Sequence, residues 1–184
     1  MPLTLIKETG DGLVDANSYA AVVDGSAYHD GHLYPAPWTA ADAATQAAAL
    51  VMATRLIDTL FRFKGFKRLS TQALQWPRRW VRDPDNNSGA VFFGLPGGPY
   101  FDETKIPKLV VDATCELARE LIEQDRTEDP EDEGLKSIAV EGAVNLEFNA
   151  ATRRPVATAV VQAMLGKVGD YIGGRSGMAR LERA

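Results

Sequence analysis

The side chains best suited to chemistry in this chain are a group of cations in one short segment, and the chemistry that they suggest is phosphate binding. Residues 62–82, called the basic segment below, contain no Asp or Glu, and their cations are Arg62, Lys64, Lys67, Arg68, Arg78, Arg79 and Arg82. Four aromatic residues are interleaved with them: Phe63, Phe66, Trp76 and Trp80. Cations neutralise phosphates and aromatic rings stack on bases, so this pattern is typical of a surface that faces nucleic acid.

The same pattern has a second interpretation, in which the basic segment does no chemistry. Aromatic side chains that follow the end of a helix are usually packed in the core. The cations would then be solvated, or paired with acidic segments elsewhere in the chain. Both interpretations stay open at the level of the sequence.

No combination of residues indicates catalysis or metal binding. His29 and His32 are three positions apart, but zinc sites usually need three or four well-placed ligands, and the chain has no other histidine and one cysteine, Cys115. Three carboxylates share one face of a predicted helix: Glu116, Glu120 and Glu123. We interpret them as a solvated face, because a catalytic acid usually needs burial or a polarising neighbour. We therefore expect no enzymatic activity, no cofactor and no metal site.

Length and composition are typical of a globular protein that needs no disulfides. The chain has 184 residues, and we expect one helical domain over residues 1–172 and a tail over residues 173–184. No run of about 18 apolar residues exists, so we expect no membrane span, and we expect no secretory signal. The single cysteine fits a protein made in a reducing cytoplasm. The formal net charge of −5 means that any contact with DNA must come from the basic segment.

One long helix should precede the basic segment and position it. It begins near Thr39 and Asp42, which suit a helix start, and its pattern continues to Phe63. Its apolar stripe steps by three and four residues: Ala43, Ala47, Leu50, Thr54, Ile57 and Phe61. Ion pairs are expected on another face, among Arg55, Asp58 and Arg62. Because the helix is apolar on more than one side, we expect it to lie at the centre of the fold.

Three further helices and several short strands complete the predicted fold. The first is a brief helix that is capped by Asp24 and ends at about His29. A helix that opens at Ile106-Pro107 is amphipathic and should pack on the long helix. A last helix begins at Pro155 and ends by Gly173. Strands are predicted over residues 3–7 and 19–23 and in a hairpin made of residues 137–140 and 144–148. The predicted class is mainly α: a small helical bundle with short strands, one β-hairpin, long loops and an extended C-terminal tail.

The tryptophan-containing part of the basic segment carries a recognisable motif. The run Gln72-Ala73-Leu74-Gln75-Trp76-Pro77-Arg78 resembles the Gln-Ala-Leu-x-Trp-Pro-Arg signature of a tailed-phage protein family. The opening of the chain, residues 8–13 and 15–19, also resembles that family. The family is often labelled DnaT-like single-stranded-DNA-binding protein, and its members are similar to phage head–tail adaptors.

The resemblance implies a structural virion protein, made in the host bacterial cytoplasm and located in the neck at the portal vertex. Many copies, with twelve expected, would form a homo-oligomeric ring between portal and tail that extends the DNA channel. Its partners would be the portal protein, a tail protein or a stopper or tail-terminator protein, and genomic DNA that passes without sequence specificity. No membrane partner is implied. The acidic helix face of one subunit could meet the basic segment of the next, because a cyclic ring needs two complementary patches.

Two groups of residues are candidates for these contacts. Subunit or DNA contacts are expected from Arg62, Lys64, Lys67, Arg68, Arg79, Trp80 and Arg82. Portal or neighbour contacts are expected at Phe92, Phe93, Arg175, Met178, Arg180, Leu181 and Arg183. The sequence leaves open the role of the rest of the long loop over residues 83–104. The alternative function is a replication accessory protein that binds single-stranded DNA by stacking on Trp76 or Trp80. The Trp76-Pro77 pair counts against it, since such a motif is more typical of a packed corner than of an exposed platform.

Overall fold

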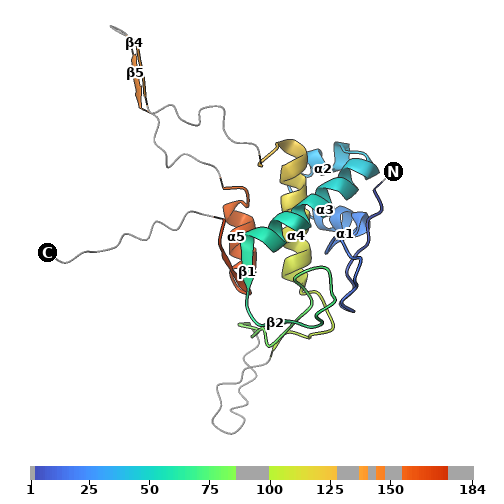
Figure 1. Cartoon of the computed structure of the whole chain (residues 1–184). Helices are drawn as coiled ribbons and strands as arrows, with labels where there is room; N and C mark the ends of the chain where they lie inside the picture. Colours follow the sequence, from blue (N-terminus) through green and yellow to red (C-terminus); the bar gives the residue numbers. More distant parts are fainter. Residues whose placement is uncertain (1–2, 86–99, 128–136, 141–143, 148–154, 174–184) are drawn as a thin grey trace, which may run out of the picture.

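The fold is mainly helical, with short antiparallel strand pairs. The computed structural model describes residues 3–85, 100–127, 137–140, 144–147 and 155–173 (Figure 1). In these residues the helices are α1 (Val22–Asp30), α2 (Ala36–Ala40), α3 (Ala43–Leu60), α4 (Lys108–Glu123) and α5 (Ala159–Leu165). The strands are β1 (Phe61–Phe63), β2 (Phe66–Lys67), β3 (Arg78–Arg79), β4 (Ser137–Val140), β5 (Val144–Glu147) and β6 (Gly169–Tyr171). The predicted class, mainly α with short strands and a hairpin, is confirmed.

Helix α3 is the long helix that the apolar stripe predicts, and it packs along α4 (Figure 1). Leu50 and Ile57 on that stripe are fully buried. The helix begins later than predicted, because Asp42 is its N-cap and accepts a hydrogen bond from the Thr45 backbone N–H at 2.7 Å. Thr39 lies instead in the short helix α2, which ends before Ala41.

The end of α3 differs from the prediction. The helix stops at Leu60, and the next three residues form β1, which pairs antiparallel with β6. Phe61 and Phe63 are buried while Arg62 between them is exposed, an alternation that three residues are too few to reveal in a sequence. Strand β6 lies in the region predicted to be helical up to Gly173, so α5 is shorter than expected. Both errors come from a strand pair whose two halves are far apart in the sequence.

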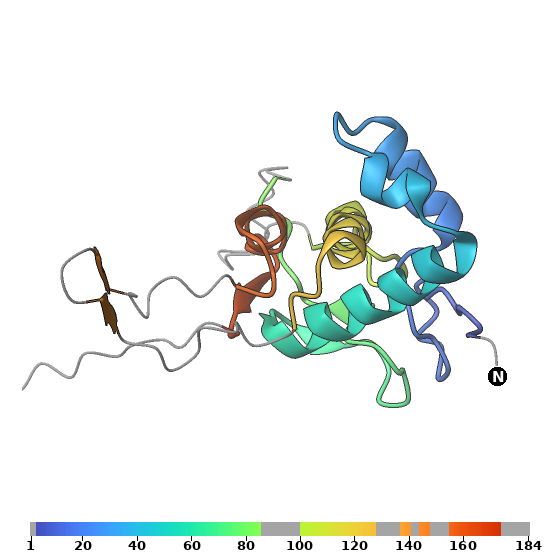
Figure 2. The same cartoon turned by 90° about the horizontal axis from the view of Figure 1, so that it is seen from above.

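Helix α4 lies between α3, α5 and the pair formed by α1 and α2 (Figure 2). Its apolar stripe is buried as predicted, with Val110, Ala113 and Leu117 fully covered. This helix therefore contacts every other helix of the body, which makes it as central as α3.

The acidic side of α4 is not the solvated face that the sequence predicts. Glu116 is buried and accepts a hydrogen bond from Arg119 Nη2 at 2.7 Å. Glu120 is also buried, 3.3 Å from Arg126 Nε, and burial raises the pKa of its carboxyl. Only Glu123 of the three is largely exposed. The prediction is wrong because α1, and the turn that follows α4, cover this side of the helix and supply partners for the carboxylates.

The segment before α1 is not a strand. The strand predicted over residues 19–23 does not form, whereas the brief helix predicted from Asp24 to about His29 is present as α1 and begins earlier, at Val22. Asp24 lies in its first turn and accepts a hydrogen bond from the Ala21 backbone N–H at 2.6 Å. A carboxylate in this position stabilises a helix start. Lys7 and Ser18 form an isolated bridge just before it.

The predicted hairpin forms, with β4 and β5 paired antiparallel and Val140 opposite Val144. Figures 1 and 2 show it apart from the helices. The chain leaves α4 toward this hairpin and returns to α5 at neighbouring points, where Arg126 Nη1 donates a hydrogen bond to the Pro155 carbonyl oxygen at 3.4 Å. The hairpin is thus an insertion whose two ends are held together at the helical body.

Candidate nucleic-acid interface

The signature motif of the basic segment is a packed corner. Trp76 is fully buried, and its ring meets those of Phe63 and Phe101 edge-on, with centroids 5.7 and 6.4 Å away. The peptide bond between Trp76 and Pro77 is cis. Gln72 is also buried, and its Nε2 donates to the Pro77 carbonyl oxygen at 3.0 Å. Trp76 is therefore not available for base stacking, and the packed interpretation is right for this residue.

The motif and the segment before it are hydrogen-bonded to the opening of the chain, residues 8–19, which also resembles the family. The Ala73 backbone N–H donates to the Leu13 carbonyl oxygen at 3.0 Å, and Arg68 Nη1 donates to the Gly10 carbonyl oxygen at 2.6 Å. Within the opening, the buried Glu8 carboxylate accepts three backbone N–H groups of the following turn, at 2.8, 2.9 and 2.8 Å. The two regions form one packed unit, and Arg68 is used inside it.

A tyrosine and an aspartate hold the motif against α3. Tyr19 OH donates to Asp58 Oδ1 and accepts from the Trp76 backbone N–H at 3.1 Å. Asp58 Oδ2 accepts from the Gln75 backbone N–H at 3.0 Å. Burial raises the pKa of Asp58 to about 6, although the two hydrogen bonds that it accepts act in the opposite direction. These hydrogen bonds replace the ion pairs that the sequence predicts for Asp58.

Arg78, the last residue of the motif, is a structural cation. Its side chain is buried and donates at 2.7 to 3.3 Å to the backbone carbonyl oxygens of Phe63, Lys64, Gly65 and Gln75. Burial also lowers the pKa of Arg78. The guanidinium thereby satisfies carbonyls of the turn between β1 and β2, where Gly65 has a φ of +68° and a Cβ would lie 2.2 Å from the Arg79 carbonyl oxygen. Arg78 fixes the shape of the neighbouring surface and does not take part in its contacts.

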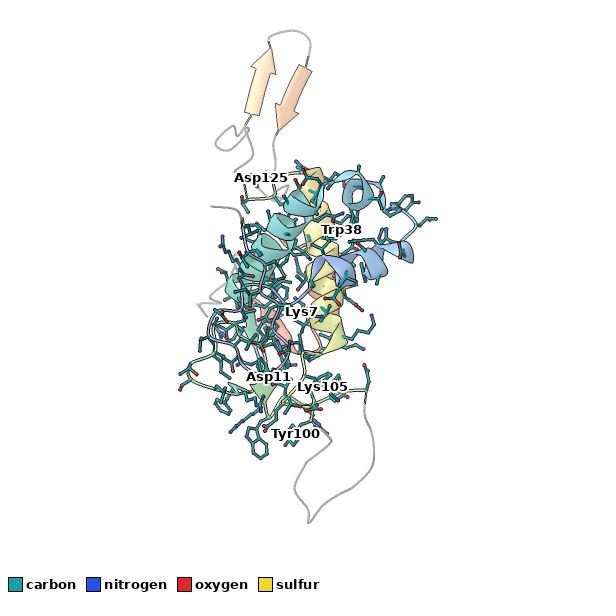
Figure 3. The ribbon with its side chains drawn as sticks, turned by 90° about the vertical axis from the view of Figure 1, so that its right-hand side faces the viewer. Lys7, Asp11, Trp38, Tyr100, Lys105 and Asp125 are labelled. Carbon is teal, nitrogen blue, oxygen red and sulfur yellow. The ribbon has the colours of Figure 1, made fainter. Side chains whose placement is uncertain are left out.

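Three exposed aromatic rings lie beyond this corner, and we call them the aromatic surface: Phe66, Trp80 and Tyr100. Strands β2 and β3 pair with Phe66 opposite Arg79, and a bridge between Arg82 and Tyr100 brings the third ring in. Phe66, Trp80 and Tyr100 are 72%, 66% and 44% exposed. The rings of Trp80 and Tyr100 lie edge to face with centroids 5.4 Å apart. Figure 3 shows Tyr100 at the end of the molecule opposite the β4–β5 hairpin.

The backbone of Trp80 is unusual. Its φ of 62° lies in the left-handed region, which a bulky side chain rarely adopts. The residues on either side hold it there: Arg79 pairs with Phe66, and the Val81 carbonyl oxygen accepts a hydrogen bond from the Phe101 backbone N–H at 2.9 Å. Strained residues of this kind cluster at functional sites. A strained tryptophan that faces solvent is the strongest local sign of function among the described residues.

The predicted cationic contacts are divided by the structure. The exposed ones are Arg62, Lys64, Arg79 and Arg82, and the half-buried ones are Lys67 and Arg68. Arg79 and Arg82 lie on either side of Trp80 and so belong to the aromatic surface. Arg62 and Lys64 belong to β1 and to the turn that follows it. The structure thus brings together Arg79, Trp80 and Arg82 from the predicted set.

Two residues of this surface are not indicated by the sequence. Tyr100 reaches Trp80 only through the bridge at Arg82, and Glu103 Oε2 lies 3.2 Å from Arg79 Nε. Neither contact can be predicted from the sequence, because both residues lie far along the chain from the basic segment. The predicted portal or neighbour contacts lie outside the described residues: Phe92, Phe93, Arg175, Met178, Arg180, Leu181 and Arg183.

The remaining reactive side chains are placed in the core. His29 is buried with Nε2 3.2 Å from the Cys115 carbonyl oxygen, and burial lowers the pKa of this imidazole. Burial raises the pKa of the Cys115 thiol to about 12, so it is a poor nucleophile. Among the described residues, no group of three or more His, Cys, Asp or Glu is arranged to hold a metal ion. In that same part of the chain, no helix has both the length and the apolar character to span a bilayer.

Comparison with known proteins points to a family. The family model described as "Putative DnaT-like ssDNA binding protein" matches residues 3–184, which is nearly the whole chain. No curated protein and no solved structure matches it.

Proposed function

The chain belongs to this DnaT-like family, and from that premise we propose that it binds single-stranded DNA through the aromatic surface and the cations beside it. The observation that carries the proposal is the pair formed by Trp80 and Tyr100, which are exposed and stand 5.4 Å apart. Large aromatic side chains are ordinarily buried, and stacking on unpaired bases is a common use of exposed ones.

The chemistry of this surface suits a single strand. Trp80 and Tyr100 offer rings on which bases can stack, and every base has a π-face, so stacking needs no particular sequence. Arg79 and Arg82 supply charges for the phosphates on both sides of Trp80. Because the whole chain has a net charge of −5, attraction for DNA has to come from local groups of cations such as Arg79 and Arg82. The Trp76-Pro77 pair, which counts against base stacking, excludes Trp76 alone as a stacking residue, because Trp80 faces solvent.

The proposal is tested by fluorescence anisotropy with a labelled oligodeoxythymidine over a range of salt concentrations. We expect binding whose log affinity falls with log salt by roughly 0.7 per phosphate contact. Trp80→Ala should weaken it by roughly 5- to 150-fold, the range for losing one stacked base. Tyr34→Ala is the matched control, since Tyr34 is an equally exposed aromatic residue in the connection between α1 and α2. Equal affinity of the wild type and Trp80→Ala would exclude this surface as the binding site.

A second candidate function, the head–tail adaptor ring, is favoured by the β4–β5 hairpin. A two-stranded hairpin is marginally stable alone in water, and this one stands apart from the helices (Figure 1). A neighbouring subunit would give it a surface. The acidic face of α4 supports such a ring less than the sequence suggests, because Glu116 and Glu120 are already paired within the chain.

Electron microscopy separates the two functions. The purified protein is mixed with the portal protein of the same phage. A ring stacked coaxially on the portal is the result expected of an adaptor, whereas free portal together with tight, salt-dependent binding of the oligonucleotide is the result expected of the single-stranded-DNA-binding protein.

A further inference from the structure

One acidic side chain lies within the cationic part of the aromatic surface. Arg79, which precedes Trp80, is 45% exposed, and its Nε is 3.2 Å from Oε2 of Glu103, which is 48% exposed. Glu103 follows Tyr100 by three residues, so one segment supplies both a stacking ring and an anion to this surface. The guanidinium of Arg79 therefore already has an anionic partner in the free protein.

The backbone position of Glu103 is set by contacts of its own segment that do not involve Arg79. On the N-terminal side, the Phe101 backbone N–H donates to the Val81 carbonyl oxygen at 2.9 Å. Asp102 then accepts the Thr104 backbone N–H at 2.9 Å and closes a turn around Glu103. That turn is seated against Gly10, where a Cβ would lie 2.0 Å from the Thr104 carbonyl oxygen. These contacts hold the backbone of Glu103 close to Arg79, and the carboxylate then lies 3.2 Å from the Arg79 Nε.

A DNA phosphate that binds the Nε side of Arg79 would have to displace this carboxylate, which lies 3.2 Å from that atom. Guanidinium donors bind carboxylates and phosphates with the same fork of N–H groups. The other acid of the turn, Asp102, is paired with Lys105 at 3.1 Å. Glu103 is therefore the acid that competes for Arg79.

We propose that Arg79 is a phosphate-binding residue and that Glu103 occupies its phosphate position in the free protein. This inference rests on the proposed binding of single-stranded DNA. Binding then exchanges one anion for another: the carboxylate leaves the guanidinium and the phosphate takes its place. Glu103 keeps the affinity lower than the cations alone would give, because its ion pair with Arg79 must break before the phosphate can bind there.

The test uses the full chain and the labelled oligodeoxythymidine. Glu103→Gln keeps the shape of the side chain but removes its charge, and it should bind about two- to fivefold more tightly, as expected for the loss of one half-exposed ion pair. The slope of log affinity against log salt should stay close to that of the wild type, because Arg79 makes the same phosphate contact in both proteins. Glu123→Gln is the matched control: the same charge change at an exposed carboxylate of α4, roughly 20 Å or more away along a 16-residue helix.

A double-mutant cycle separates exchange at Arg79 from a general effect of charge. In an Arg79→Gln background the gain from Glu103→Gln should disappear, because the residue that the two anions compete for is gone. An equal gain in that background, or with Glu123→Gln, would overturn the inference and leave DNA binding intact. Equal affinities of the wild type and Glu103→Gln would also overturn the inference and leave DNA binding intact. Failure of the wild type to bind would instead overturn the proposed function, and this inference with it.

Discussion

At the scale of single residues, two adjacent arginines have different roles. The Arg78 guanidinium is buried against backbone carbonyl oxygens, whereas Arg79 faces solvent next to Trp80. They carry the same charge and sit in the same strand, so the sequence does not distinguish them. The direction of each side chain does, because neighbouring residues of a strand point to opposite faces.

These two arginines give a paired prediction about stability. Arg78→Gln should lower the free energy of unfolding by about 2–4 kcal/mol, because several carbonyl oxygens lose a charged donor and stay buried. Arg79→Gln should change it by less than about 0.5 kcal/mol, as is usual for an exposed side chain. Urea unfolding followed by circular dichroism measures both. Equal effects of the two substitutions would contradict the buried role of Arg78.

A second prediction at this scale concerns the Asp58 carboxyl. Burial raises its pKa to about 6 in the folded protein, against about 3.9 in an unfolded chain. The folded state therefore binds this proton more tightly, and the stability that protonation adds is present below about pH 4 and is lost as the pH rises through about 6. Relative to Asp58→Asn, the wild-type free energy of unfolding should fall by up to about 3 kcal/mol across that window.

The control for this pH dependence is Asp42, the N-cap of α3. Its pKa is lowered by the hydrogen bond that it accepts from the Thr45 backbone N–H, so its contribution has the opposite sign and is lost as the pH falls. Unfolding of the wild type, Asp58→Asn and Asp42→Asn is followed over one pH series. A difference between wild type and Asp58→Asn that stays constant with pH would show that Asp58 titrates normally.

At the scale of elements, the two long helices and the β4–β5 hairpin are predictable, whereas the pair formed by β1 and β6 is not. The stripes through Leu50 and Ile57 and through Val110 and Leu117 repeat over several turns, and each is buried as a consequence. Strands β1 and β6 are three residues each and stabilise one another across most of the chain, so neither has a local signal. Glu116 was misassigned for a related reason: a helical pattern marks a polar face, but not the helix that will cover it.

The candidate site follows the same division. The basic segment is visible in the sequence because it is a local concentration of charge without acids. The Trp76-Pro77 pair indicates a packed residue at Trp76, but no local pattern shows that Trp80 is exposed. Tyr100 and Glu103 join the surface only through strand pairing at a distance.

The packing of α1 on α2 gives a prediction for this scale. A Cβ on Gly25 of α1 would lie 2.4 Å from the Trp38 ring of α2. Alanine favours an isolated helix over glycine by about 1 kcal/mol, but here Gly25→Ala should lower the free energy of unfolding by about 1–3 kcal/mol, because the two helices must separate. Thermal and urea unfolding measure the change.

Gly31→Ala is the control for that substitution. Gly31 lies at the end of the same helix, and a Cβ there would have its nearest neighbour at 3.8 Å. We expect almost no change in stability. If Gly25→Ala has the same free energy of unfolding as the wild type, then α1 and α2 can move apart at little energetic cost, and the prediction is wrong.

At the scale of the whole molecule, the two candidate surfaces lie at opposite ends. The aromatic surface is at the end that contains Tyr100, and the β4–β5 hairpin extends from the other (Figure 3). Contacts at one end should therefore be separable from contacts at the other.

A deletion tests this separation. Replacing residues 137–147 by a short Gly-Ser linker should leave the unfolding of the helical body unchanged within about 0.5 kcal/mol, because the clamp of Arg126 on Pro155 closes the ends of the insertion. If the hairpin docks on a neighbour, the deletion should also abolish self-association measured by light scattering, whereas Trp80→Ala should not. A large loss of stability on deletion would show that the hairpin stabilises the helical body of the same subunit.

The contrast between the three tryptophans gives the unmodified protein two optical reporters. Trp38 and Trp76 are sealed from water, while Trp80 is open to it. A dissolved quencher such as iodide should therefore reach the emission of Trp80 alone, and the blue-shifted remainder should report on the folded core. Occupation of the surface at Trp80 and unfolding of the body can thus be recorded as separate signals from one unlabelled sample.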